Sequence, residues 1–402
     1  MDPVSPLPAI ACLLMAMATA FLLVKKFGAP PDQGRFASID GLRGYLAFFV
    51  FLYHSCVWYF YLRTGQWNVP PSNLYAHFGE SSVLLFFMIT GFLFFSKLID
   101  GRTKSIDWGK LFVSRFLRLV PLYLSVMLLL FLVVAYLSKG ELKEPITKLL
   151  NEAIQWLSFT IPGGPNLNGV ANTFIITAGV TWSLPYEWIF YLSLPLLALT
   201  VRVAPPLPYI ALSVAVIVGL AIWHPAHIHS LILVPFLGGI TASFLVRSEL
   251  FRQFAVRRIS SFIALGSIAL AVTFYPSAFE AVPLLLLCVA FVLIACGNNM
   301  YGVLVSPISR TLGEMAYSIY LLHGITLFIF FNFILGITAS RELTPLAHWL
   351  VVAGITPVLV SLCFLTFRYI ESPAMRSTTT FTAWLRSRAT LRAKGASQAE
   401  HP

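Results

Sequence analysis

Long runs of apolar residues are the feature that most restricts what this chain can fold into. Eleven runs approach or reach the roughly 17 to 25 residues that an α-helix needs to cross about 30 Å of hydrocarbon. They are residues 7–24, 38–62, 81–99, 116–137, 182–201, 207–223, 230–246, 259–275, 281–295, 312–335 and 347–367. They are apolar on every face, whereas the strands of a membrane barrel alternate. We therefore predict an all-α fold, a polytopic transmembrane helical bundle of about eleven helices.

The composition indicates that most of the protein surface contacts a lipid bilayer. Hydrophobic residues make up 58% of the 402 residues and charged residues only 11%, too few to cover a soluble protein. This balance also excludes a disulfide scaffold and a large nucleic-acid-binding domain, so we expect no nucleic acid partner. The five cysteines lie almost entirely in apolar runs without metal or redox spacing, and we interpret them as small buried side chains.

The distribution of positive charge predicts how the bundle lies in the membrane. With an outside amino terminus, 22 of the 27 Lys and Arg residues fall on the cytosolic side. The five exceptions are Arg63, Lys139, Lys143, Lys148 and Arg341. We therefore predict an outside amino terminus and a cytosolic carboxyl terminus, and we attribute much of the net charge of +11 to topology.

Three regions are expected along the chain. Residues 1–37 form an extra amino-terminal transmembrane helix and linker, residues 38–373 form the main membrane domain, and residues 374–402 form a basic cytosolic tail. The long outer stretch 138–181 has two interpretations, an acceptor-binding element that lies on the membrane or caps a cavity, and an ordered connector.

The second apolar run carries the polar residues whose burial in a membrane costs the most free energy. Arg43 and His54 are eleven positions apart, three helical turns plus about 20°, so they share one face about 16 Å apart along the axis. Asp40 lies one turn before Arg43 and can pair with it, and Gly41 and Gly44 allow a neighbouring backbone to approach. An ionisable side chain in a membrane helix is a functional candidate, although anchoring and interhelical bonding are the alternatives.

Two arginines at the start of the fourth run indicate an anion site. Arg115 and Arg118 are three positions apart, share a face, and beside Arg43 could bind phosphate at the cytosolic mouth. Ordinary topology charge is the alternative explanation.

Two further runs carry polar groups at comparable depths. Glu187 lies about 8 Å in from the outer end of the fifth run, a depth compatible with His54, so we predict that these two side chains pair. Tyr317, Tyr320 and His323 form a stripe that we interpret as the lining of a polar cavity, with aromatic packing as the alternative. The short cluster of His224, His227 and His229 lacks an acid partner, so we predict no metal site.

Six motifs in order now resemble a known family. They are Asp40-Gly-Leu-Arg43 with His54, Phe86 to Phe92, Arg115-x-x-Arg118, Trp182-Ser-Leu-x-x-Glu187, Leu312 to His323, and Ile370-Glu-Ser-Pro373. Together they resemble the acyltransferase-3 family, polytopic membrane O-acyltransferases that modify O-antigen, exopolysaccharide, Nod factors and some antibiotics. The resemblance covers about residues 38–373, which would be a ten-helix core. The chain departs from the family pattern at Leu84, Thr90 and Ala316.

The resemblance implies an acyl-CoA donor, usually acetyl-CoA, on the cytosolic side and a hydroxyl of a carbohydrate or other acceptor on the outer side. In that case Arg43, Arg115 and Arg118 would bind the donor, with Arg43 also near the chemistry. His54 would act as general base or transient acyl carrier, and Glu187 would orient it. Donors to the oxyanion would be Ser183, Tyr317 or Tyr320, which the sequence does not rank. Asp40, Trp182 and His323 are further candidates near the substrate.

These observations favour an O-acetyltransferase in a bacterial cytoplasmic, or inner, membrane, needing no metal. A transporter or flippase of an anionic or lipid-linked solute is the main alternative, because it would also surround a cavity with charges. An inactive member of the family acting as a sensor is a third. The asymmetric layout, with arginines at one face and a His and Glu pair toward the other, favours the enzyme.

Overall fold

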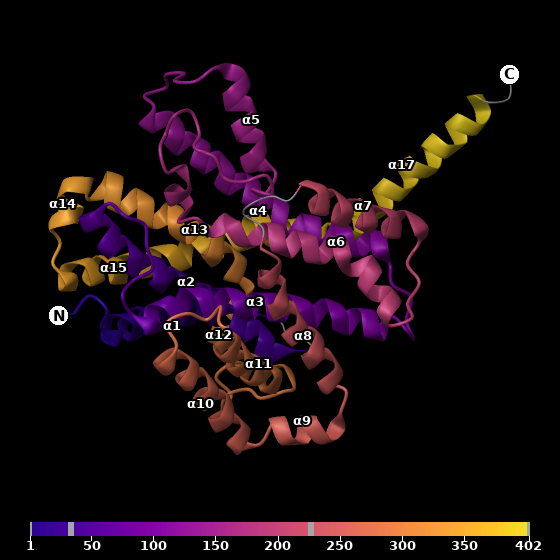
Figure 1. Cartoon of the computed structure of the whole chain (residues 1–402), viewed down its shortest axis with the longest axis horizontal. Coiled ribbons are helices and arrows are strands. Elements are labelled where there is room, and N and C mark those ends of the chain that lie inside the picture. Colours follow the sequence, from indigo (N-terminus) through magenta and orange to yellow (C-terminus); the bar gives the residue numbers. More distant parts are fainter. Residues whose placement is uncertain (1, 31–35, 224–228, 400–402) are drawn as a thin grey trace.

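The structure is a computed structural model, and it describes residues 2–30, 36–223 and 229–399, apart from the side chains of residues 230 and 389–399. The described chain is helical throughout, and it contains no β-strand. Most of the long helices run along the longest axis of the molecule (Figure 1). Large apolar side chains cover the outside, for example Leu207 at 75% exposed and Ile222 at 77%. Such a surface is stable against lipid and not against water.

Within the described residues, six helical spans are long and apolar enough to cross a membrane. They are α1 (Pro6–Phe27), α2 (Ala37–Thr64), α3 (Asn73–Asp100), α4 (Trp108–Leu137), α13 (Ala316–Ile329) with η4 (Phe330–Ile334), and α15 (Pro345–Thr366) with η5 (Phe367–Glu371) and α16 (Ser372–Arg376). A bent pair, α8 (Val234–Leu245) with α9 (Glu249–Ala255), makes a seventh if it counts as one span, and it bends by 110°.

Every predicted run contains a helix, but the prediction of eleven crossings is not confirmed. The other apolar helices have 15 to 17 residues, which at 1.5 Å per residue is shorter than about 30 Å of hydrocarbon. They are α6 (Leu184–Thr200), α7 (Leu207–Trp223), α10 (Arg258–Phe274) and α11 (Ala281–Ala295). The remaining short elements are α5 (Ile146–Leu157), η1 (Thr173–Thr177), η2 (Val180–Ser183), η3 (Ser230–Leu233), α12 (Pro307–Glu314) and α14 (Ile337–Glu342). The tail forms a longer helix, α17 (Thr378–Ala399).

Helices α2, α3 and α13 form the centre of the bundle. In their most apolar windows 72 to 78% of the residues are buried, compared with 28% in α1 and 33% in the span that contains α15. The polar residues of α2 and α13 are therefore surrounded by protein, while α1 and α15 present most of their surface outward. Helix α1 packs against α15 and α12 at the edge of the bundle.

Glycines allow α2 and α12 to touch backbone to backbone. A Cβ at Gly41 would lie 1.8 Å from the carbonyl oxygen of Leu304, and one at Gly313 would lie 1.9 Å from that of Asp40. A Cβ at Gly44 would lie 2.6 Å from Leu312. The close approach predicted from Gly41 and Gly44 is confirmed, and it fixes the start of α13 against α2.

The long stretch between α4 and α6 enters the bundle instead of only covering it. Helix α5 stands apart from the long helices (Figure 1), but the Tyr123 hydroxyl in the middle of α4 donates to the carbonyl of Trp156 at 2.5 Å. Further along, η1 packs on α13, where a Cβ at Gly324 would lie 2.3 Å from the carbonyl of Thr177. The stretch thus forms a wall beside His323, the residue before Gly324.

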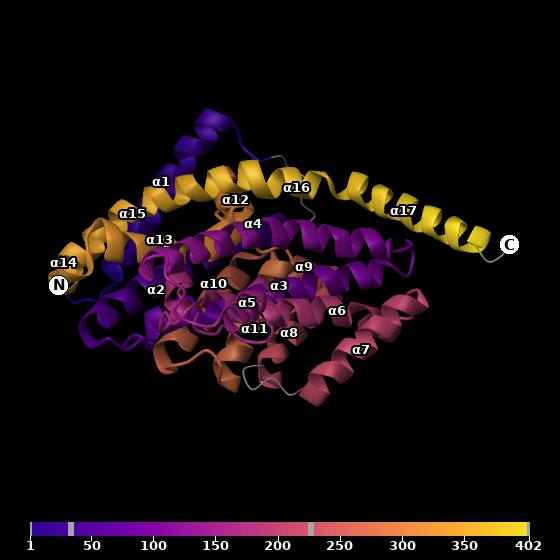
Figure 2. The ribbon, with the colours of Figure 1, turned by 90° about the horizontal axis from the view of Figure 1, so that it is seen from above.

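The carboxyl-terminal tail is helical. Helix α17 follows α15 and α16 along one side of the molecule and projects past the other helices (Figure 2). The Arg386 guanidinium donates to the Asp107 carboxylate at 2.6 Å, which ties α17 to the start of α4. The Asp107 carboxylate also accepts from the backbone N–H of Lys110, and this bond together with Arg386 lowers its pKa.

The contact between α2 and α12 gives a stability prediction. We expect Gly313→Ala to lower the free energy of unfolding by about 1 to 3 kcal/mol, because the new methyl group meets a backbone carbonyl that cannot move independently. Thermal unfolding of the detergent-solubilised protein measures the change. Gly354→Ala in α15 is the matched control, because nothing lies within 4 Å of its added Cβ and alanine is the better helix former. Equal melting temperatures for the two variants would contradict the prediction.

Candidate functional site

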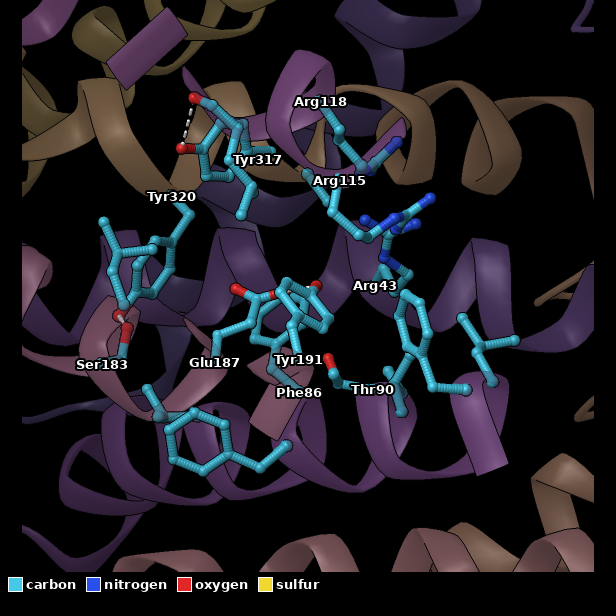
Figure 3. A pocket seen from close by; sticks show the side chains of 18 residues that line it. Arg43, Phe86, Thr90, Arg115, Arg118, Ser183, Glu187, Tyr191, Tyr317 and Tyr320 are labelled. Atoms are coloured by element: carbon cyan, nitrogen blue, oxygen red, sulfur yellow. Dashed lines mark hydrogen bonds between the residues drawn. The ribbon is translucent and has the colours of Figure 1, made fainter. Parts of the chain in front are cut away.

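A cavity of about 230 Å³ lies between α2, α3, α4, α6 and α13 (Figure 3). Its polar lining comes from Arg43, Thr90, Arg115, Arg118, Ser183, Glu187, Tyr191, Tyr317 and Tyr320. The α3 wall is mainly apolar and includes Phe86, the first residue of the Phe86 to Phe92 motif. Three of the helices that surround the cavity are the buried centre of the bundle, so its polar groups are shielded from lipid.

One end of the cavity holds the three arginines that the sequence singled out. Arg43 comes from α2, and Arg115 and Arg118 come from consecutive turns of α4. The Arg115 guanidinium lies 5.0 Å from the centre of the Phe94 ring, and its Nε is buried without a hydrogen-bond partner among the described residues. Arg118 Nη1 lies 3.2 Å from Sδ of Met375. Three guanidinium groups around one space make a site for an anion.

Glu187 belongs to this arginine end. Figure 3 places it beside Tyr191 and between the arginines and Ser183. Its carboxylate accepts a hydrogen bond from the Tyr191 hydroxyl, one helical turn along α6, and it interacts electrostatically with Arg43 and Arg115. The carboxylate therefore offsets part of the positive charge.

The prediction that Glu187 pairs with His54 is wrong in this structure. The Nδ1 atom of His54 instead lies 2.9 Å from Nε2 of His323, which comes from α13. Both imidazoles are buried, and their ring centres are 5.0 Å apart. Trp67, in the connection between α2 and α3, packs against the His54 ring.

The hydrogen bonds fix the tautomers of the neutral histidine pair. Nδ1 of His323 lies 2.9 Å from the carbonyl oxygen of Ile319, which only accepts, so this nitrogen carries the proton. Nε2 of His323 is then an acceptor, and Nδ1 of His54 donates to it, with a second contact to the carbonyl of Val50 at 3.1 Å. Nε2 of His54 is left with a free lone pair, which is the form a general base or nucleophile requires.

The hydroxyl groups between the arginines and the histidines are now ranked by their bonds. Ser183 and Tyr320 hydroxyls are 2.8 Å apart at the end of the cavity away from the arginines (Figure 3), and the Tyr320 ring lies 6.3 Å from that of His323. Tyr317 donates to the carbonyl of Leu119 at 3.0 Å, and the Tyr320 hydroxyl also lies 3.1 Å from the carbonyl of Val180. Ser183 and Tyr320 are therefore the hydroxyl pair of the cavity lining that lies on the side of His323.

Four predicted residues do not line the cavity: His54 and His323, which lie beside its Tyr320 end, and Asp40 and Trp182. Asp40 lies beyond it at the start of α2 and interacts electrostatically with Arg43. Trp182 is 39% exposed and packs edge-on against Tyr186.

The role of His323 was missed, although the sequence carries a signal for it. His54 is 17 residues after the start of α2, and His323 is 16 residues after the start of α12, which continues into α13. Two helices that cross at their first turns bring such positions to the same depth. The contact that sets this register, between Gly41 of α2 and Leu304 just before α12, is not visible in a single sequence.

Glu371 was also missed as a buried polar residue. It ends the π-helix η5, is 1% exposed, accepts from the Ser318 hydroxyl, and has no partner for Oε2 among the described residues. It interacts electrostatically with Arg118 and Arg43. The sequence marked it only as part of a motif.

In the part of the chain that the structure describes, no three His, Cys, Asp or Glu side chains are grouped to hold a metal ion. His224 and His227 lie outside the described residues.

These features define a helical integral membrane protein with a cavity that holds three arginines at one end and two hydroxyl groups near a buried histidine pair at the other. The family model for the acyltransferase domain Acyl_transf_3 matches residues 36–368, nearly the whole chain. The chain belongs to this family, which supports a membrane acyltransferase over the transporter alternative. No curated protein and no solved structure matches it.

The tautomers can be tested without any substrate. With ¹⁵N-labelled histidine in the protein, we expect solid-state NMR to show His54 and His323 protonated at Nδ1 at neutral pH, because both Nδ1 atoms face carbonyl oxygens. Spectra of His54→Ala and His323→Ala assign the two signals by difference. A His54 signal protonated at Nε2 alone would contradict the hydrogen-bond chain.

Proposed function

We propose that this protein transfers an acyl group, most simply acetyl, from acyl-CoA to a hydroxyl of an extracytoplasmic glycan or related acceptor. The observation that carries the proposal is the polarity of the cavity, with three arginines at one end and Ser183 and Tyr320, beside the histidine pair, at the other. Membership of an acyltransferase family supports it.

In this proposal the arginine end receives the donor from the cytosol. The diphosphate of CoA is anionic, and guanidinium groups bind phosphate oxygens with two hydrogen bonds each. The buried Nε of Arg115 still lacks a partner, as expected of a group that waits for a ligand. Along α2, Arg43 and His54 are about 16 Å apart, which is comparable to the extended pantetheine arm. The thioester can therefore reach the histidines while the nucleotide stays near the membrane surface.

His54 acts as the general base. Its Nε2 takes the proton of the acceptor hydroxyl, the hydroxyl oxygen attacks the thioester carbonyl carbon, and the C–S bond breaks. The proton on Nε2 then passes to the departing thiolate, which leaves an ester on the acceptor and a free CoA thiol. His323 accepts the Nδ1 proton of His54 in a hydrogen bond throughout, which holds the ring in position and stabilises its charged form.

Ser183 and Tyr320 stabilise the oxyanion in this scheme. They share a hydrogen bond, line the cavity, and lie on the side toward His323. A hydroxyl that turns from its neighbour toward the developing charge would lower the barrier most in a site closed to water. Glu187 offsets one of the three positive charges at the empty arginine end, which lowers the cost of holding the guanidinium groups together before the donor binds.

The proposal requires the predicted topology, with α2 and α4 starting at the cytosolic face of a bacterial cytoplasmic membrane. The large excess of Lys and Arg on that side supports it. The acceptor would then approach from the opposite side, past Trp67.

The donor and the role of His54 are tested together. We expect purified protein to bind [¹⁴C]acetyl-CoA, and membranes that contain it to move the label into a glycan or glycolipid fraction and release free CoA thiol. His54→Ala should reduce this transfer by about 10² to 10⁴-fold while donor binding remains, because a general base contributes that much to rate. Full transfer by His54→Ala would refute the mechanism. Label on His54 itself, trapped without acceptor, would assign it as the acyl carrier instead.

The positioning role of His323 has its own test. His323→Ala removes the acceptor of the Nδ1 proton, and we expect kcat to fall by about 10- to 100-fold, as for the loss of a hydrogen bond to a charged group. His323→Gln should recover much of the rate, because an amide oxygen can accept from the same proton. Donor affinity, measured in parallel, should stay the same in both variants. Equal rates for the two variants would show that His323 only fills space.

A further inference from the structure

A second cavity opens at the arginine end of the bundle, on the far side of Arg118. Its volume is about 830 Å³, within the range of small-molecule sites. Its walls come from the end of α1 and the segment after it, from α12, and from α15, η5 and α16. We call it the vestibule.

Its polar lining carries more positive than negative charge. Arg368 and Arg376 both line it, and neither belongs to any ion pair found among the described residues. Glu314 is the one carboxylate of the lining, and it interacts electrostatically with Arg376. Thr311 and Ser372 add hydroxyl groups. Two cations and one carboxylate around a hollow leave a net positive charge, which favours an anion that bears several oxygens.

Aromatic side chains stand beside these cations. Phe27, at the end of α1, is 43% exposed, and Tyr369 is 69% exposed, although both line the vestibule. The Arg368 guanidinium lies 4.9 Å from the centre of the Phe27 ring, so this arginine is held near an aromatic face. Exposed aromatic rings next to arginines provide stacking surfaces for a base as well as bonds for its phosphates.

The vestibule and the buried cavity share a wall. Arg118 lines the buried cavity, its Nη1 contacts Sδ of Met375 at 3.2 Å, and Met375 lines the vestibule. Methionine is unbranched and adaptable, so this wall can open with a change of one side chain. A ligand that is nucleotide at one end and a thin chain at the other fits two chambers joined in this way.

We infer that the vestibule binds the phosphorylated adenosine end of the acyl-CoA donor, through Arg368 and Arg376 on its phosphates. The inference rests on the proposed function and names where the second half of the same donor lies. It also gives α1 a role, because Phe27 to Pro30 form one wall. These residues precede the part of the chain that matches the family and Arg376 follows it, whereas Arg368 lies at its end.

The test compares three donors that differ in what they present to the vestibule. Purified protein in a neutral detergent is titrated with acetyl-CoA, with acetyl-dephospho-CoA, which lacks the 3′-phosphate, and with acetyl-pantetheine, which lacks the nucleotide. We expect Arg368→Ala and Arg376→Ala each to raise the Kd for acetyl-CoA about 5- to 10-fold, as for a partly exposed charge pair. The Kd for acetyl-pantetheine should not change, which also shows that the variants are folded.

Arg258→Ala is the matched control, because Arg258 is exposed and lines neither cavity. At least one of the two vestibule variants should also lose the difference between acetyl-CoA and acetyl-dephospho-CoA. Unchanged acetyl-CoA affinity in both variants would overturn the inference while leaving the proposed function intact. If wild-type protein binds none of the three donors, the proposed function itself fails.

A phospholipid headgroup carries the same phosphate chemistry and needs its own arm. The titrations are repeated in nanodiscs of phosphatidylcholine with and without phosphatidylglycerol. Donor affinity that is independent of phosphatidylglycerol is expected. The opposite result would be that phosphatidylglycerol weakens donor binding in the wild type and in Arg258→Ala but not in the two vestibule variants. It would show that the vestibule binds a lipid headgroup instead of the nucleotide.

Discussion

The structure depends on one constraint, which is that polar groups inside a lipid-facing bundle must satisfy one another. Lipid offers no hydrogen bonds, so each buried ion costs several kcal/mol unless another polar group or water faces it. In this protein the groups sort into two sets. The arginines share their space with Glu187, and His54 and His323 satisfy each other in a line of hydrogen bonds that ends at a backbone carbonyl. The first set lines the cavity, and the histidine pair lies beside the end formed by Ser183 and Tyr320.

The histidine pair depends in turn on how closely two helices can approach. Gly41, Gly44 and Gly313 remove the side chains that would separate α2 from α12, and this contact fixes the height of α13 against α2. Farther along α13, Gly324 lets the re-entrant η1 segment press against the helix beside His323. Backbone packing from two directions therefore sets the position of one imidazole. A histidine so held can keep a single tautomer, which a loosely packed side chain would not.

Much of this was readable in the sequence. A helix lies within every predicted apolar run, and the spacing of Arg115 and Arg118 did bring them to one face beside Arg43. The prediction that Glu187 pairs with His54 was wrong. It rested on the similar depth of the two residues in their helices, which does not say which faces of the helices meet, and the Glu187 carboxylate lies toward the arginines. The prediction of eleven membrane crossings was not confirmed for a related reason. Helices such as α11, with 15 residues, are apolar enough for a membrane but too short to cross it alone. The sequence does not show how such helices pack against their neighbours.

The separation of the two polar sets explains how one site could serve reactants from opposite sides of a membrane without a continuous water path. In the proposed function, the arginine end would hold the charge on the donor, and only the uncharged arm and thioester would enter the apolar middle. The acceptor would need only to bring one hydroxyl to Nε2 of His54, beside Trp67. Phe86, Leu93 and other apolar side chains of α3 line the cavity, and in the proposed function they would limit the access of water to the thioester. A transporter needs its central site to open alternately to both sides, whereas the proposed transfer needs only a fixed cavity with unlike ends, because only the acyl group would cross.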